Sequence, residues 1–112
     1  MWAEPIKFRR ADAPSKRAVC VTVRGEVIEG TQDEAEGLLK DLAFSVDVDE
    51  PGCTSYVLTR QMGSYRHFVV HARFVDWRAF QRHAETPHFN HMLPRLTPLL
   101  AAPVSMEIFL EV

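Results

Sequence analysis

The hydrophobic pattern changes its period between residues 19 and 46, and this change constrains the fold more than any other feature of the sequence. Residues 19–23 alternate valine with Cys and Thr, which is the period of a half-buried β-strand. From Thr31 to Val46, apolar residues instead recur three and four positions apart, as on one face of a helix. Thr31 and Glu34 match a T-x-x-E capping box at its start. The domain is therefore predicted to open with a strand followed by a helix.

A β-hairpin is predicted next. Pro51 and Gly52 form the turn that leads into it, with Gly52 supplying a positive φ angle. Residues 53–60 and 66–74 are rich in β-branched and aromatic residues and flank a turn that contains Gly63. We expect Leu58 to lie opposite Phe68, which directs the even-numbered residues of both strands to one face.

Two short helices and a last strand complete the predicted fold. Asp76 is a suitable N-cap for a helix over residues 77–84, and Thr86 followed by Pro87 predicts a second helix that continues to Leu100. Residues 104–112 alternate again and predict a strand. The order β-α-β-β-α-α-β predicts an α+β, ferredoxin-like fold in which the helices cover one face of an antiparallel sheet.

Length and composition predict one domain. The chain has 112 residues, of which 46 % are hydrophobic and 25 % charged, and its formal net charge of −2 provides no basic surface for nucleic acid. We interpret residues 1–17 as an N-terminal arm and residues 18–112 as the folded domain. No segment is apolar enough for a signal peptide or a membrane span, so we expect a cytoplasmic protein with Cys20 and Cys53 as reduced thiols.

The sheet face that points away from the helices is predicted to form a homodimer interface. It combines apolar side chains with charges of both signs, so it is too apolar for a fully solvated surface. A second copy could cover it and pair arginines with glutamates, whereas a solvated face is the alternative. The predicted members of this face are Thr22, Arg24, Ser55, Val57, Thr59, His67, Val69, His71, Arg73, Glu107, Phe109 and Glu111.

Three of the five histidines lie within nine residues, which raises the question of a metal site. His88 and His91 are three positions apart on a helix and could share an ion, but the nearest obvious carboxylate is Glu85 and the spacing matches no closed zinc pattern. We therefore predict no metal. His83 closes one helix and His88 begins the next, so the cluster is interpreted as a helix junction.

Three segments of the chain resemble the antibiotic biosynthesis monooxygenase domain, a member of the dimeric α+β barrel superfamily. They are EPGCTSYVL, FVVHARFVDWRAFQRHAETPHF and LTPLLAAPVSMEIFLEV, which span residues from about 50 to the C-terminus. The most specific part is the Pro-Gly turn followed by the pattern A-F-x-x-H-x-x-T-P-H-F. The likeness extends from about residue 19 and implies a dimeric barrel with a ligand cavity between sheet and helices.

Members similar to this chain include cofactor-free oxygenases that act on quinols and phenols. The resemblance therefore implies a small planar aromatic substrate, with His83 as the base, since the unperturbed pKa of histidine lies near neutrality, and with Tyr56 positioning the phenol. Phe74 and Phe80 would stack on its ring. The implied substrate-binding residues are Val23, Phe68, Val70, Phe74, Phe80, Phe89, Met92 and Leu96.

Departures from the family pattern leave other functions open. Haem-degrading members use an Asn, a Trp and an axial His where this chain has Val23, Phe74 and Leu93, so haem is disfavoured and no cofactor is expected, although His91 lies two residues from the axial position. The polyketide oxygenases use an Asn, a Trp and a Tyr where Val70, Phe74 and Phe80 stand. A dimer that only binds a small ligand, or an isomerase or cyclase, remains the alternative.

Overall fold

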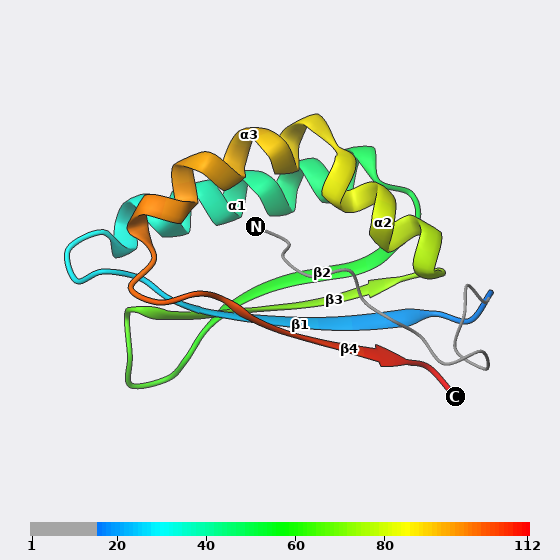
Figure 1. The fold of residues 1–112 in the computed structure, drawn as a ribbon, viewed down its shortest axis with the longest axis horizontal. Coiled ribbons are helices and arrows are strands. Elements are labelled where there is room, and N and C mark those ends of the chain that lie inside the picture. Colours follow the sequence, from blue (N-terminus) through cyan, green and yellow to red (C-terminus); the bar gives the residue numbers. More distant parts are fainter. Residues whose placement is uncertain (1–15) are drawn as a thin grey trace.

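Four antiparallel strands form one sheet, and three α-helices cover one face of it, in a computed structural model that describes residues 16–112 (Figure 1). The strand order is β2-β3-β1-β4. Their bounds are β1 Val19–Glu26, α1 Gln32–Asp49, β2 Cys53–Arg60, β3 His67–Phe74, α2 Trp77–Glu85, α3 Pro87–Leu96 and β4 Ser105–Leu110. The predicted α+β, ferredoxin-like fold is confirmed. Except for Lys16 and Arg17, the predicted arm lies outside the described residues.

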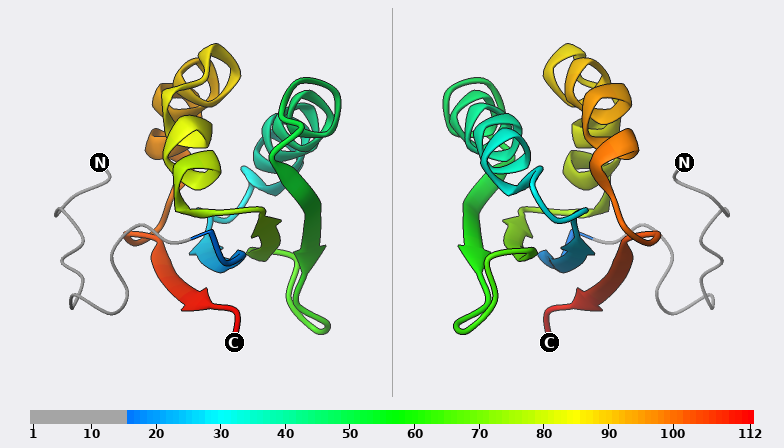
Figure 2. Two further views of the ribbon diagram at one scale, coloured as in Figure 1. Left: turned by 90° about the vertical axis from the view of Figure 1, so that its right-hand side faces the viewer. Right: turned by 90° about the vertical axis from the view of Figure 1, so that its left-hand side faces the viewer.

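The helices form two rows above the sheet. Viewed along the strands, α1 lies over the β2 side, while α2 and α3 lie over the side of β1 and β4 (Figure 2). The space between the two helix rows and the sheet is therefore the interior of the domain, and the odd-numbered valines of β1 point into it.

In residues 16–112, no helix has the length and hydropathy needed to cross a membrane.

The strand register agrees with the predicted faces but not with the predicted hairpin pairing. Val21 of β1 pairs with Ala72 on one side and Ile108 on the other, so these three side chains share the covered face. Leu58 pairs with Val70 rather than with Phe68. The prediction was wrong by two residues because residues 61–66 all stay outside the ladder. An even-numbered error leaves every side chain on its expected face.

Two of the three predicted helix caps are confirmed. The Asp76 carboxylate accepts the Ala79 backbone N–H at 2.8 Å, and the Thr86 hydroxyl accepts that of Phe89 at 3.3 Å. The predicted capping box at Thr31 is wrong, because its hydroxyl donates to the Ile28 carbonyl at 2.6 Å and caps no helical N–H.

The last helix is shorter than predicted. It ends at Leu96 and is followed by a 3-10 turn over Thr97–Leu99 instead of continuing to Leu100. Pro98 explains the change, because it lacks the N–H that an α-helix would direct to the carbonyl four residues earlier. The 3-10 turn then returns the chain towards β4.

Gly52 is required for space and not for its φ angle. Among the described residues, positive φ angles occur at Gly30 and Gly63, so the prediction for Gly52 was wrong. A Cβ atom built on Gly52 would lie 2.7 Å from the Cβ of Ala79, closer than two such atoms can approach. The turn before β2 therefore packs directly against α2.

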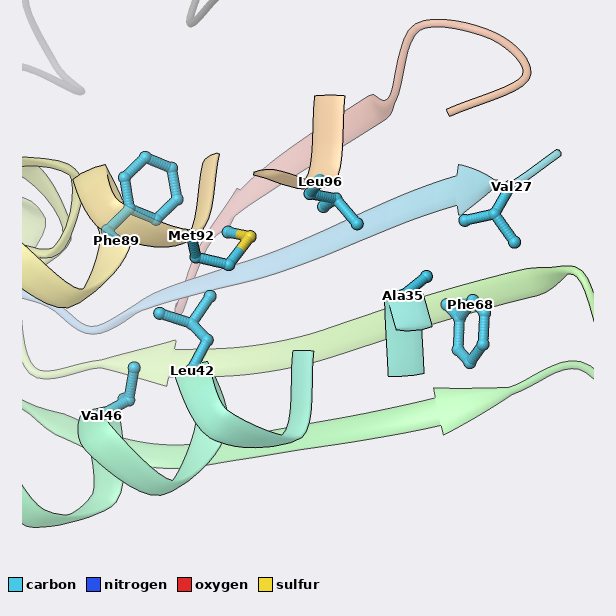
Figure 3. Packing of buried hydrophobic residues seen from close by; sticks show 8 residues of the cluster. All are labelled: Val27, Ala35, Leu42, Val46, Phe68, Phe89, Met92 and Leu96. Atoms are coloured by element: carbon cyan, nitrogen blue, oxygen red, sulfur yellow. The ribbon is translucent and has the colours of Figure 1, made fainter. Parts of the chain in front are cut away.

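Two apolar clusters form the core. One joins α1 and α3 to the ends of β1 and β3, and Figure 3 shows its members, with Leu42 of α1 pointing towards Met92 of α3: Val27, Ala35, Leu42, Val46, Phe68, Phe89, Met92 and Leu96. The other joins the middle of the sheet to α2: Val19, Val21, Val70, Ala72, Phe74, Ala79 and Phe80. The candidate site lies where the two clusters meet.

Candidate functional site

A cavity of about 90 Å³ lies between the sheet and the helices. All three helices contribute to it, including α1 through Leu42, whereas the sequence predicted only the second and third helices. Its lining residues are Val21, Val23, Leu42, Tyr56, Val70, Ala72, Phe74, Phe80, His83, Phe89, Met92, Leu93 and Val104. A largely apolar space with few polar groups, between a sheet and its helices, is typical of small-molecule sites.

The cavity brings together most of the residues that the sequence singled out. Both predicted catalytic residues line it, and so do these predicted substrate-binding residues: Val23, Val70, Phe74, Phe80, Phe89 and Met92. Phe68 and Leu96 do not line it, because both are buried in the neighbouring core cluster. Phe68 pairs with Gly25 and Arg60 near the ends of β1 and β2, which places it away from the cavity.

The size of the cavity limits its ligand. A site needs roughly 10–15 Å³ of such volume for each water molecule, so 90 Å³ corresponds to about six to nine waters. That is comparable to one aromatic ring with a few substituents. The cavity therefore has room for a single-ring ligand.

Tyr56 and His83 are the two polar side chains in this lining. The Tyr56 hydroxyl and the Nε2 atom of His83 make no hydrogen bond to another described residue. In residues 16–112, every side-chain nitrogen or oxygen that is fully buried has a hydrogen-bond partner. Both atoms must therefore face accessible space. Both residues line the cavity, so its open volume is the candidate space for these two atoms.

Burial determines the protonation state of Tyr56. Desolvation raises the pKa of its phenol far above the ordinary range, and nearby Cys53 and Glu50 raise it further. The hydroxyl consequently stays neutral at physiological pH. It can donate one hydrogen bond to a ligand oxygen, and it can accept one.

His83 lies in the last turn of α2 and is only 5 % exposed. Its ring packs against three aromatic side chains, with centroid distances of 5.6 Å to Tyr56, 5.4 Å to Phe74 and 5.1 Å to Phe89. Its Nδ1 atom lies 3.1 and 3.0 Å from the two carboxylate oxygens of Glu50. An ionised carboxylate can only accept, so Nδ1 carries the proton and leaves Nε2 of a neutral imidazole as an acceptor.

Glu50 also binds a second histidine. Its Oε2 atom lies 2.5 Å from Nε2 of His88, which stands in the first turn of α3. Burial acts to raise the pKa of Glu50, but the hydrogen bonds and electrostatic attraction of the two histidine N–H groups outweigh it and hold the pKa below its ordinary value. The carboxylate is therefore ionised at neutral pH and joins the end of α1 to both later helices.

Sequence reasoning missed Glu50. From the sequence, Glu85 was considered as the carboxylate and His88 with His91 as the histidine pair, and no metal was predicted. Instead, His88 faces Glu50, while His91 is hydrogen-bonded to Arg95 on the exposed side of α3. The E-P-G sequence could have indicated this partner. The turn that places Gly52 against α2 also places Glu50 beside His83.

The two cysteines are unpaired, and both are half-buried rather than fully buried. Burial of Cys53 raises the pKa of its thiol from 9.0 to about 11, with a further contribution from the charge of Glu50. Its Sγ atom is 3.3 Å from the carbonyl of Ser55. Because the thiolate is the nucleophile, the raised pKa disfavours Cys53 as a nucleophile at neutral pH.

Comparison with known proteins identifies the family. The model of the family described as antibiotic biosynthesis monooxygenase matches residues 18–95. A proposed antibiotic biosynthesis monooxygenase from Caulobacter crescentus has 26 % identity over 87 % of this chain and 92 % of its own, with a TM-score of 0.82.

Two more distant structures share the fold. A proposed antibiotic biosynthesis monooxygenase from Nitrosomonas europaea has 14 % identity over 88 % of this chain and 93 % of its own, with a TM-score of 0.81. The protein Rv0793 from Mycobacterium tuberculosis has 22 % identity over 85 % and 95 % of the two chains, with a TM-score of 0.79. No protein with a curated description matches the sequence significantly. With the family model covering well over half of its length, the chain belongs to the antibiotic biosynthesis monooxygenase family.

Proposed function

We propose that the protein is a cofactor-independent monooxygenase that oxidises a single-ring quinol or phenol with O₂. The observation that carries the proposal is the pair of unpaired polar atoms, Tyr56 Oη and His83 Nε2, in an otherwise apolar cavity. One is a neutral hydroxyl and the other a proton acceptor held by a buried carboxylate. Together they can recognise and deprotonate a phenolic hydroxyl.

The substrate itself supplies the electrons in this reaction. Nε2 of His83 removes the phenolic proton, and the Glu50 carboxylate stabilises the imidazolium that forms. The resulting phenolate is electron-rich enough to pass an electron to O₂, after which the two radicals combine. One oxygen atom enters the ring and the other leaves as water, so that a quinol and O₂ give a hydroxyquinone and water.

The protein contributes orientation and the exclusion of water. Tyr56 hydrogen-bonds the oxygen of the bound ring, and Phe74 and Phe80, whose own centroids are 5.4 Å apart, supply aromatic faces beside it. The apolar lining keeps water from the radical pair. Neither role requires the Asn, Trp and Tyr of the polyketide oxygenases, which this chain lacks.

We also propose a homodimer through the sheet face opposite the helices. Val57 and Phe109 remain 48 % and 52 % exposed there. Arg73 forms a two-pronged ion pair with Glu111 of the same chain at 2.9 and 2.8 Å, and Arg24 pairs with Glu107 at 3.6 Å, so these charges are already partnered within one subunit. Apolar contact would therefore dominate the interface rather than pairing of arginines and glutamates between subunits.

The dimer is tested by sedimentation equilibrium. The parent protein should sediment with twice the chain mass, and Phe109→Asp, which places a charge on the proposed interface at the edge strand β4, should sediment as a monomer. Phe44→Asp is the matched control, because Phe44 is 71 % exposed on α1 and faces away from the sheet. A monomeric parent protein at high micromolar concentration would contradict the interface.

Oxygen uptake tests the proposed chemistry. Tag-free protein should consume O₂ with substituted hydroquinones, more slowly or not at all with fused polycyclic phenols, and the uptake should persist in a strong chelator. Formation of one hydroxyquinone and one water for each O₂ would match the stoichiometry. No uptake with any quinol would refute the oxygenase and favour ligand binding alone, or isomerase or cyclase chemistry that uses the same histidine without O₂.

A further inference from the structure

We infer that Glu50, His83 and His88 form a binding site for a divalent transition-metal ion. The three residues come from three elements, the end of α1, the last turn of α2 and the first turn of α3. One ligand atom of each lies within 4.8 Å of the other two. This site adjoins the cavity, sharing His83 with it, while Glu50 and His88 do not line the cavity.

The donor set selects the class of ion. Two imidazole nitrogens and one carboxylate oxygen match the ligands of Zn²⁺ and its neighbours in the first transition row, whereas Mg²⁺ and Ca²⁺ prefer oxygen ligands alone. Three protein ligands leave one position of a tetrahedral ion for water.

The present hydrogen bonds hold the ligand atoms close to the required geometry. In a tetrahedral zinc site with bonds of about 2.0–2.1 Å, ligand atoms lie about 3.3 Å apart. Here Nδ1 of His83 is 3.0 Å from Oε2 of Glu50, and Nε2 of His88 is 2.5 Å from the same oxygen. The third pair, His83 and His88, lies within 4.8 Å, so the side chains of His88 and Glu50 must adjust for all three atoms to bind one ion.

His88 provides the route by which an ion can reach the site. The side chains of His83 and Glu50 are 6 % and 8 % exposed, but that of His88 is 15 % exposed at the protein surface. His88 stands in the first turn of α3, so the partly exposed end of the site lies at this helix start. An ion would enter past the His88 ring.

Metal binding and base catalysis would compete for the same histidine, a consequence that rests on the proposed function. Nδ1 of His83 carries a proton while it is hydrogen-bonded to Glu50, and Nε2 is then the acceptor. A metal on Nδ1 replaces that proton, so the neutral ring must carry its hydrogen on Nε2. The nitrogen that faces the cavity would change from acceptor to donor, and zinc would inhibit oxidation of the substrate.

Zinc binding is measured without any substrate. Tag-free protein, stripped with a chelator, is titrated with Zn²⁺ against a chromophoric indicator and by calorimetry. We expect one ion per chain and a rise in melting temperature on loading. His88→Ala should weaken binding at least about tenfold, since it removes one of three ligands, while the matched variant His91→Ala should bind as the parent does. No binding by the parent, or equal binding by His88→Ala, would overturn the site.

Inhibition is measured separately, so that the two proposals can fail independently. With a quinol that the parent oxidises, stoichiometric Zn²⁺ should lower O₂ uptake and a chelator should restore it. The same Zn²⁺ should inhibit His88→Ala less. Zinc binding without O₂ uptake under any condition would leave the metal site standing and refute the oxygenase. O₂ uptake that saturating bound zinc does not change would refute the competition for His83.

Discussion

Replacing His83 with Asn should lower the rate of quinol oxidation by about 100-fold to 10,000-fold, the range that a positioned general base contributes. The amide nitrogen of Asn can occupy nearly the position of Nδ1 and still donate to Glu50, which lies 3.0 Å away. What the variant lacks is Nε2, the acceptor that faces the cavity. The loss should therefore appear in kcat, measured as initial O₂ uptake at saturating substrate.

Two controls separate the loss of the base from damage to the fold. His91→Asn makes the same change at an exposed histidine of α3 and should keep the parent rate. For His83→Asn itself, the rate should recover partly as pH rises, because the solvent then deprotonates more of the phenol without help. A His83→Asn variant with the full parent rate at neutral pH would show that another group takes the proton.

Replacing Phe74 with Ala should destabilise the protein by about 3–5 kcal/mol, the usual cost of removing a buried phenyl ring. Phe74 is 1 % exposed, and its ring contacts Phe80 and His83 with centroid distances of 5.4 Å in both cases. The neighbouring strands hold its backbone on both sides, so the space left by the ring cannot close. The free energy of unfolding is measured in urea at one fixed protein concentration, because dimerisation would contribute to it.

Phe44 supplies the matched control for Phe74. It is 71 % exposed on α1, so Phe44→Ala should change the free energy of unfolding by less than about 0.5 kcal/mol.

The Phe74→Ala variant should also bind larger aromatic ligands than the parent, because the vacated volume adjoins the cavity. Loss of less than about 1 kcal/mol would mean that the strands and α2 had collapsed onto the site.

Local patterns predicted the strands and the starts of two helices well, because these features depend on a few adjacent residues. Alternation placed the valines of β1 on the covered face, and Asp76 and Thr86 each satisfy a backbone N–H within their own segment. The errors arose where the outcome depended on competition between nearby groups. The Thr31 hydroxyl donates to a backbone carbonyl that precedes it in the chain. Pro98 ends a helix although the apolar pattern continues beyond it.

The candidate site was predictable only in part. The cavity-lining positions followed from strand parity and from the resemblance to the family, which also drew attention to His83. The partner of His83 could not be found in this way, since Glu50 is 33 residues earlier in the chain and belongs to no periodic pattern. Its position depends on how the turn after α1 packs against α2. Phe68 and Leu96 were assigned to the cavity wrongly. The periodicity of a strand or helix shows which face a side chain lies on, but it does not show how far along that face the cavity extends.

The contact between Gly52 and Ala79 has a kinetic consequence. Because only a hydrogen atom fits between the turn and α2, the helix cannot move closer to the turn, and this contact helps to hold His83 of α2 at its hydrogen-bonding distance from Glu50. The base is therefore oriented before any ligand arrives. Binding need not organise the catalytic pair, so that cost does not add to the activation barrier of the reaction.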